Sequence, residues 1–225
     1  MGSRNTVVAA GVFLFFAITG FLLFGRAGVG KAGLAVRPAV APRPGVLLVA
    51  RPQLPDPRFA QAVILLVRHD PSGSVGLIVN RPSDYAVDEL VPGLGDAAHR
   101  YRIWFGGPVA PYRVSFLIRT GESLSGTEPV LGSLRYGTDT ATLEALMARG
   151  TSPDDLHVFL GYAGWGPGQL DSELLNGDWI LMEGDERDVM APDGLWERLM
   201  ERREPAGLLV RKTPPPPPSR RTVSF

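Results

Sequence analysis

The sequence predicts an α+β fold, in which a single domain carries a bent, partly antiparallel sheet flanked by helices. Short apolar runs rich in β-branched residues recur between residues 46 and 182, each bounded by Gly, Pro, Asp or Asn. Helical windows lie among these runs, and several early runs are too close together for helical crossovers, so their strands must pair antiparallel. The length of 225 residues suits one domain with extensions.

Residues 6–25 form an uncharged run that predicts one N-terminal transmembrane helix. At about 1.5 Å per residue it spans roughly 30 Å, the thickness of a bilayer's hydrocarbon core. A cleaved signal peptide is the alternative, but its apolar core usually covers about 7–15 residues, and no A-x-A site follows Phe24. The basic residues that follow the run place the domain in the cytoplasm, with a soluble cytoplasmic protein as the other possibility.

Two basic segments flank the domain. Residues 26–45 are small and punctuated by proline, which is typical of a flexible linker. Their G-x-G-x-x-G sequence at Gly28–Gly33 has neither the preceding strand nor the following helix of a dinucleotide site, so we expect no cofactor there. Residues 205–225 hold five consecutive prolines among basic residues, which predicts an extended, disordered tail.

Seven runs within the domain at 46–204 have the length and composition of strands. Residues 63–67 are apolar throughout, so this run is expected to be buried on both faces. The seven runs are Val46–Ala50, Ala62–Val67, Val75–Asn80, Ile103–Phe105, Val114–Ile118, His157–Gly161 and Trp179–Met182.

Three windows have the spacing and the end signals of helices. Thr138 or Asp139 caps the first window, and Gly150 closes it. Gly177 and Pro205 stop the other two. These two windows are Gln169–Leu175 and Leu195–Arg203.

The net charge of zero hides an asymmetry between the domain and its flanks. All 23 acidic residues but only 14 of the 23 basic ones fall within 46–204, so the domain carries −9 and the flanks together +9. Phosphate contacts dominate non-specific affinity for nucleic acid, and an acidic domain provides them poorly. We therefore expect no direct nucleic-acid binding by the domain.

The sequence contains no catalytic or metal-binding constellation. It has no cysteine, which excludes disulfides, thiol nucleophiles and Cys-ligated metals. The histidines His69, His99 and His157 lack the spacing of metal ligands, and no serine lies in a G-x-S-x-G elbow. The adjacent His69 and Asp70 could pair a base with its orienting acid, but neighbouring residues on a strand point apart. We expect no catalytic residue, metal or cofactor.

The strongest indication of a ligand or partner surface is the segment Gly161–Trp179, where glycines alternate with aromatic residues. Glycines permit close approach, the aromatic side chains offer stacking faces or core bulk, and the helix start at Gln169 could receive an anion. The segment is either a strand-to-helix turn packed on the sheet or a ligand or partner surface. Two more turns would frame a cleft with it if they met in space. The candidate surface comprises Asn80, Arg81, Gly106, Gly107, Pro108, Tyr162, Gly164, Trp165, Gly168 and Gln169.

Four motifs lie in order between about Gly45 and Arg203. They are R-P-x-L-x-D-P-x-F at Arg51–Phe59, G-L-I-V-N-R-P at Gly76–Pro82, G-G-P-V at Gly106–Val109 and G-Y-A-G-W-G-P-G-Q-L at Gly161–Leu170. Together they resemble the YqgE/AlgH family of bacterial proteins. The resemblance implies an α+β fold whose bent sheet forms a pseudo-barrel. It transfers no catalytic residues, and one branch of the family carries the label of a transcriptional regulator of exopolysaccharide synthesis.

These observations lead to one expected function and one alternative. We expect a non-enzymatic regulatory or protein-interaction domain of the YqgE/AlgH type, tethered to the membrane through residues 6–25 and bound to a protein partner. The membrane span and the proline-rich tail depart from the family pattern. The alternative is a small-molecule-binding protein or an enzyme that uses the glycine and aromatic cleft.

Overall fold

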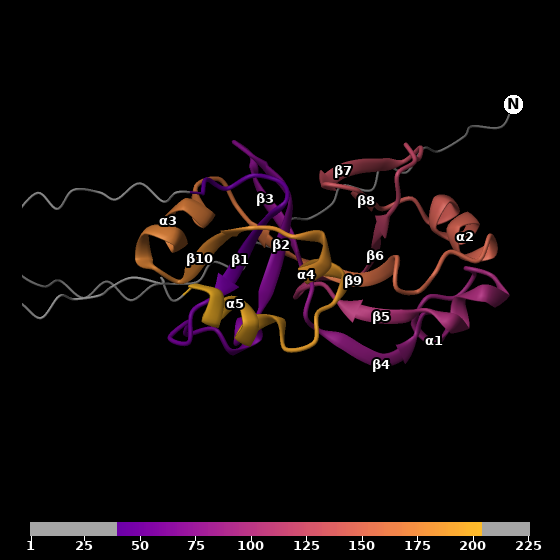
Figure 1. Ribbon diagram of the computed structural model, residues 1–225, viewed down its shortest axis with the longest axis horizontal. Helices are drawn as coiled ribbons and strands as arrows, with labels where there is room; N and C mark the ends of the chain where they lie inside the picture. Colours follow the sequence, from indigo (N-terminus) through magenta and orange to yellow (C-terminus); the bar gives the residue numbers. More distant parts are fainter. Residues whose placement is uncertain (1–39, 204–225) are drawn as a thin grey trace, which may run out of the picture. The chain divides into compact units, whose positions relative to one another are not determined.

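One ten-stranded sheet organises residues 40–203, the part of the chain that the computed structural model describes (Figure 1). The predicted membrane span at 6–25, most of the linker and the tail at 205–225 lie outside the described residues. Between residues 40 and 203, no helix combines the length and the apolar character that crossing a bilayer requires.

The sheet curls into a half-barrel, and its strands follow the order β10-β1-β2-β3-β9-β6-β8-β7, with β4 and β5 attached through β9. All pairs are antiparallel except β5 with β9. This arrangement confirms the α+β class. The strands are β1 Val46–Ala50, β2 Val63–Asp70, β3 Gly73–Ile78, β4 Pro82–Ala86, β5 Arg102–Phe105, β6 Val109–Arg119, β7 Thr127–Leu131, β8 Leu134–Gly137, β9 Leu156–Trp165 and β10 Trp179–Glu183.

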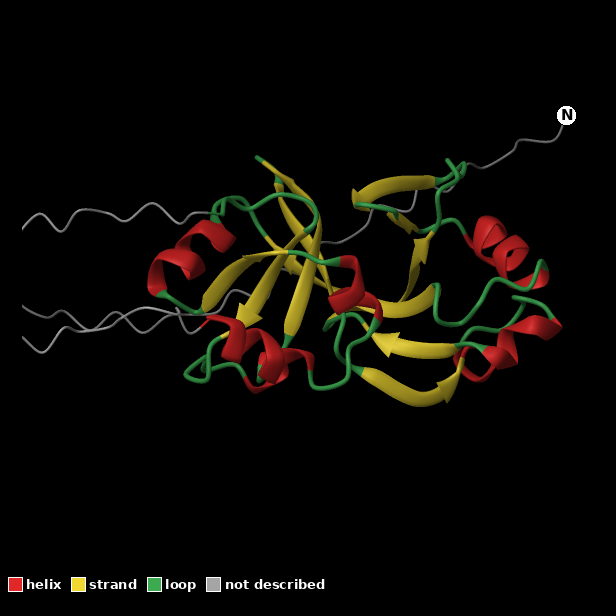
Figure 2. Ribbon diagram, viewed as in Figure 1, coloured by secondary structure: helices red, strands yellow, loops and turns green. Residues whose placement is uncertain are grey.

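Within residues 40–203, five α-helices and two 3₁₀ turns accompany the sheet (Figure 2). Asp139 caps α2 by accepting a hydrogen bond from the Thr142 backbone N–H at 2.8 Å, and Gly177 ends α3 in the left-handed conformation. All three predicted helices are confirmed. The helices are α1 Val87–Leu90, α2 Thr140–Ala148, α3 Gln169–Asn176, α4 Glu186–Met190 and α5 Leu195–Arg203, and the 3₁₀ turns are Pro57–Phe59 and Asp96–Arg100.

Three buried clusters hold the helices on the sheet. The largest contains Phe159 of β9 and is covered by Val189 of α4 and by α5. The second packs α2 against β5, β6 and the first half of β9. The third packs Leu170 of α3 against β2 and Trp179 of β10. β2 lies between two clusters, and its residues 63–67 are buried on both faces as predicted.

Each predicted strand overlaps an observed one, but several boundaries are wrong: β2 ends three residues later, β3 lies two residues earlier, β6 begins five residues earlier and β9 ends four residues later than predicted. The sequence ends a strand at Gly161, whereas β9 continues to Trp165. Gly161 has a φ of 70°, a left-handed conformation that lets the strand bend without ending. Before this bend β9 pairs with β5 and β6, and beyond it β9 keeps one pair with β6, at Val109, and then pairs with β3. β9 is thereby the strand that joins the two halves of the sheet.

Candidate functional site

The three turns of the candidate surface do meet in space, at the bend of β9. The backbone at Gly106 and Gly107 crosses that of β9 so closely that a Cβ on Gly106 would lie 2.4 Å from the Gly161 carbonyl oxygen. A Cβ on Gly107 would lie 2.3 Å from the Tyr162 carbonyl carbon. The Gly106 amide donates to Leu160, and its carbonyl accepts from Ile78, both at 2.9 Å. These glycines therefore serve close backbone packing.

Asn80 and Arg81 hold neighbouring backbone. The Asn80 side chain accepts from the Val63 amide at 2.9 Å and donates to the Gln61 carbonyl at 2.8 Å. The Arg81 guanidinium donates to the carbonyl oxygens of Arg58 and Ala60. Both side chains thus fix the segment that leads into β2.

Trp165 lies in the core, with 7% of its surface exposed, and it packs edge-on against Trp179 at a centroid distance of 6.1 Å. Glu173 of α3 accepts hydrogen bonds from both indole N–H groups at 2.8 Å. Gln169 donates to the other Glu173 oxygen at 3.0 Å and accepts from the Gly166 amide. The end of the fourth motif therefore holds α3 against β9 and β10 through hydrogen bonds. The ring of Trp165 is buried and does not form part of the surface.

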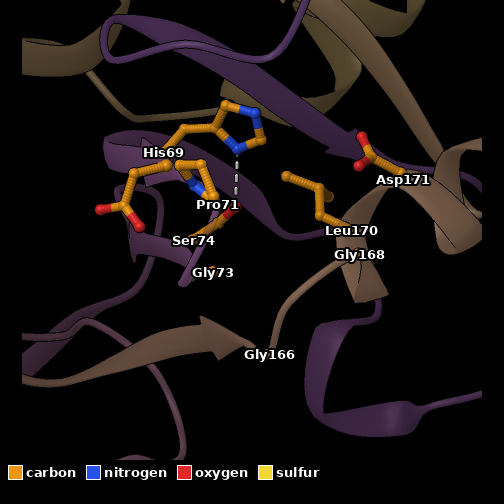
Figure 3. A pocket seen from close by; sticks show the side chains of 9 residues that line it. His69, Pro71, Gly73, Ser74, Gly166, Gly168, Leu170 and Asp171 are labelled. Atoms are coloured by element: carbon orange, nitrogen blue, oxygen red, sulfur yellow. Dashed lines mark hydrogen bonds between the residues drawn. The ribbon is translucent and has the colours of Figure 1, made fainter.

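A pocket of about 350 Å³ lies where the turn between β2 and β3 faces the start of α3 (Figure 3). A Cβ on Gly73 would lie 2.2 Å from the Trp165 carbonyl oxygen, so this turn packs directly on the end of β9. Of the ten candidate residues, only Gly168 lines the pocket. The lining residues are His69, Asp70, Pro71, Gly73, Ser74, Gly166, Gly168, Leu170 and Asp171.

His69 and Ser74 form the polar centre of this pocket. They stand opposite each other in the β2–β3 register, with His69 Nδ1 2.8 Å from Ser74 Oγ, and Ser74 is buried (Figure 3). This bond occupies Nδ1, so Nε2 is the ring nitrogen that a bound molecule would meet. Asp70 instead accepts from the Ser72 hydroxyl and amide, which holds its pKa below the usual value. The adjacent pair of His69 and Asp70 is therefore not a base with its orienting acid.

Neither the pairing of His69 with Ser74 nor the role of Glu173 was predicted from the sequence. The D-P-S-G sequence at residues 70–73 is a turn signal between two strands, and a hairpin there sets His69 opposite Ser74. No comparable local signal joins Glu173 to Trp165 and Trp179. Within residues 40–203, no group of three His, Cys, Asp or Glu side chains is arranged to hold a metal ion.

A bulge in β6 carries a second feature of the surface. Val109 pairs with Tyr162 and Val114 with Leu160, so the four residues 110–113 of β6 lie opposite the single residue Gly161 of β9. Ala110 adopts a φ of 45°, which is uncommon for a residue other than glycine. Tyr112 is 91% exposed, and the Arg113 guanidinium lies 5.7 Å from the centroid of the Tyr162 ring. The bulge presents an aromatic side chain beside the fourth motif.

Comparison with known proteins places residues 47–206 in one family, whose model is described as AlgH-like. A UPF0301 protein of Myxococcus xanthus is 40% identical over 161 residues, covering 68% of this chain and 86% of the relative. A UPF0301 protein of Streptomyces avermitilis is 38% identical over 166 residues, covering 70% and 85%. These names assign no reaction or ligand.

Two solved structures share the fold. The solution structure of AlgH from Pseudomonas aeruginosa is 34% identical, with a TM-score of 0.57, covering 72% of this chain and 89% of that protein. A crystal structure of a Corynebacterium diphtheriae protein gives a TM-score of 0.61 at 27% identity, covering 74% and 90%. The matched range contains the four motifs between Arg51 and Leu170 that resemble this family. The chain therefore belongs to the YqgE/AlgH family.

Proposed function

We propose that the chain is a non-enzymatic regulatory or protein-interaction domain, tethered to the membrane through residues 6–25 and facing the cytoplasm. One observation carries the interaction role. Of the six exposed large hydrophobic side chains within residues 40–203, five lie between Tyr85 and Tyr112, and the sixth is Leu175. These five are close in the sequence, and exposed aromatic and apolar side chains are typical of surfaces that bind partner proteins.

A site-specific photocrosslink tests this role. We would place a photoreactive phenylalanine analogue at position 112 of the full chain in cells and irradiate them. The expected result is one stoichiometric protein adduct. The matched control carries the analogue at Leu175, which is 89% exposed on α3 and lies outside the 85–112 region. Absence of an adduct at 112, or the same adducts at both positions, would contradict the proposal.

The proposed membrane tether is supported only by the apolar run at residues 6–25. Its nine Phe, Leu and Ile residues from Phe13 to Phe24 each favour insertion by about 0.3–0.6 kcal/mol, and the run holds no charged residue. We expect the full chain to stay in the membrane fraction after a carbonate wash and to keep its first residues. Recovery of the intact chain in the soluble fraction would refute the tether. A mature N-terminus after Phe24 outside the cytoplasm would indicate a signal peptide.

The pocket favours a second candidate function, the binding of a small molecule. Its volume of about 350 Å³ and the polar pair of His69 and Ser74 are suited to a metabolite. Native mass spectrometry of the chain purified from its own host would reveal a ligand that co-purifies. A His69→Phe variant should lose that ligand, whereas His99→Phe, a change outside the pocket lining, should keep it.

The charge of the domain argues against nucleic acid as the partner. Residues 46–204 carry −9, so we propose that they form no complex with duplex DNA at physiological salt. A mobility-shift titration with random and genomic duplexes checks this. A sequence-selective complex of sub-micromolar affinity would restore a regulator that acts on DNA directly.

A further inference from the structure

One stretch of this acidic domain has the opposite charge. From Ala97 to Gly121 the sequence holds four arginines and no acidic residue, whereas the whole domain carries −9. This stretch comprises β5, the glycine crossing and all of β6. Its central part, Phe105–Arg113, is called the crossover segment below. Basic charge thus accompanies the run in which exposed hydrophobic side chains are concentrated.

Three hydrophobic side chains of the crossover segment reach solvent. Phe105 is 45% exposed, Val109 is 37% exposed and Tyr112 is 91% exposed. They lie on both sides of the crossing at Gly106 and Gly107, whose backbone is fixed against β9. The segment therefore displays its side chains from a rigid base, which lowers the entropy lost when a partner is bound.

Two of the four arginines are exposed, and their side chains have no ion-pair or hydrogen-bond partner within residues 40–203. Arg119 is engaged by Asp155 at 2.6 Å, and Arg100 donates to the Met147 carbonyl oxygen. Arg102 and Arg113 are exposed, and neither forms an ion pair within residues 40–203. The stacking of Arg113 on the ring of Tyr162 orients its guanidinium.

We propose, building on the interaction role above, that the crossover segment docks a short acidic segment of a partner protein, with apolar side chains between its carboxylates. A guanidinium binds a carboxylate through two parallel hydrogen bonds, and exposed Phe and Tyr accept apolar side chains. A short segment contacts this basic stretch alone. An anionic bilayer or a nucleic acid is more extended and would also face the acidic remainder of the domain.

Selection from a random peptide library tests the chemistry of the partner. The full chain in detergent micelles is the bait, and a Tyr112→Asp chain is used for counter-selection. We expect the enriched peptides to combine Asp or Glu with apolar residues. Binding of one such peptide should weaken about tenfold with Arg113→Glu, and a peptide with Lys in place of its acids should recover affinity for that variant.

The control makes the same charge change away from the segment. Arg187 on α4 has a side chain that is 91% exposed, so Arg187→Glu should leave peptide affinity unchanged. Because Arg113 and Tyr112 are both exposed, their variants should melt at the temperature of the original chain. An equal loss of affinity with Arg187→Glu would mean that only long-range charge acts, and it would overturn the proposal.

The remaining outcomes separate this proposal from the function on which it rests. If the enriched peptides are neutral or basic and their binding requires Tyr112, the partner segment is not acidic, but the domain still has an interaction role. No Tyr112-dependent enrichment would refute both. Arg113-dependent binding to vesicles of anionic phospholipid, without such peptides, would assign the segment to a membrane. Self-association that Tyr112→Asp abolishes would assign it to a second copy.

Discussion

β9 and β6 are paired neighbours in the sheet, yet the residues of β9 and those of the β6 bulge have opposite surroundings. Eight of the ten residues of β9 are buried, whereas the first five residues of β6 are all exposed. Each strand holds part of a family motif, G-Y-A-G-W in β9 and the valine of G-G-P-V at the start of β6. Motif residues in β9 are thus explained by packing. The side chains available to a partner lie in the adjoining bulge, just past a motif.

The contrast between the buried β9 and the exposed bulge distinguishes residues that stabilise the fold from residues that could bind a partner. A glycine whose Cβ would meet backbone at 2.3 Å is required for the fold, whatever the domain binds. An exposed tyrosine contributes little to the fold, and its side chain is available to a partner. Substitutions in β9 should therefore change stability, and substitutions in the bulge should change binding.

The largest effect is expected from Gly161→Ala at the bend of β9. The new Cβ would lie 2.3 Å from the Gly107 carbonyl oxygen, and the φ of 70° disfavours alanine. We expect a loss of about 4 kcal/mol or more in the free energy of unfolding, or no folded protein. Urea denaturation measures it, with Gly121→Ala as the control, because a Cβ there meets nothing within 4 Å. A Gly161→Ala variant as stable as the original chain would show that residues of β9 are not required for stability in the way proposed.

Trp165→Ala, also in β9, should cost about 3–5 kcal/mol as a large-to-small substitution in the core. It also removes one of the two indole N–H groups that bind Glu173, so α3 should loosen. Denaturation and amide hydrogen exchange of α3 measure the two effects. A variant that melts like the original chain but loses a ligand or partner would show that Trp165 is a surface element.

His157 near the start of β9 should make stability depend on pH. Its ring stacks on Trp104 at 4.5 Å, its Nδ1 is buried without a hydrogen-bond partner, and burial lowers its pKa to about 4. The unfolded chain, with a pKa of 6.5, binds more protons between these values, so stability falls as the pH drops from 6.5 towards 4. The loss attributable to His157 should approach about 3 kcal/mol.

Two variants check the assignment of this pH dependence. His157→Phe keeps an aromatic ring on Trp104 but has no titrating group, so its stability should change less between pH 6.5 and 4. His99 is exposed, and His99→Gln should retain the loss of the original chain. If His157→Phe and His99→Gln lost stability equally over this range, His157 would not be its source.

The parts of the fold that the sequence predicted are those with a strong local pattern. The apolar run at 63–67 and the capped window that begins at Asp139 are examples. β4, β7 and β8 were missed. They are short, β4 and β7 carry a proline, and each lies at or next to an edge of the sheet, where burial leaves a weaker pattern. The continuation of β9 past Gly161 was missed because glycine usually ends a strand.

The candidate site was predicted less completely, because it depends on which segments meet. The glycine turns were recognised, and they do converge, but their contact with β9 fills the space that a cleft would need. The pairing of His69 with Ser74 depends on hairpin register. A sequence also does not distinguish Tyr112, which is 91% exposed, from Tyr101, which is 1% exposed, because both are tyrosines beside an arginine.

That pair of tyrosines provides the prediction with the smallest effect on stability. Tyr112→Ala removes a ring that is almost wholly in solvent, so the free energy of unfolding should change by less than about 0.5 kcal/mol. Tyr101→Ala removes a buried ring and its 2.6 Å hydrogen bond to the Thr151 carbonyl oxygen, and should cost about 3–5 kcal/mol. Urea titrations of both variants make the measurement.

If Tyr112→Ala destabilised the domain as much as Tyr101→Ala, the bulge would be part of the packed fold in solution, and its exposed ring could not serve a partner. If Tyr112→Ala kept full stability but lost the photocrosslinked or peptide partner, residues of β9 would determine stability and residues of the β6 bulge would determine partner binding.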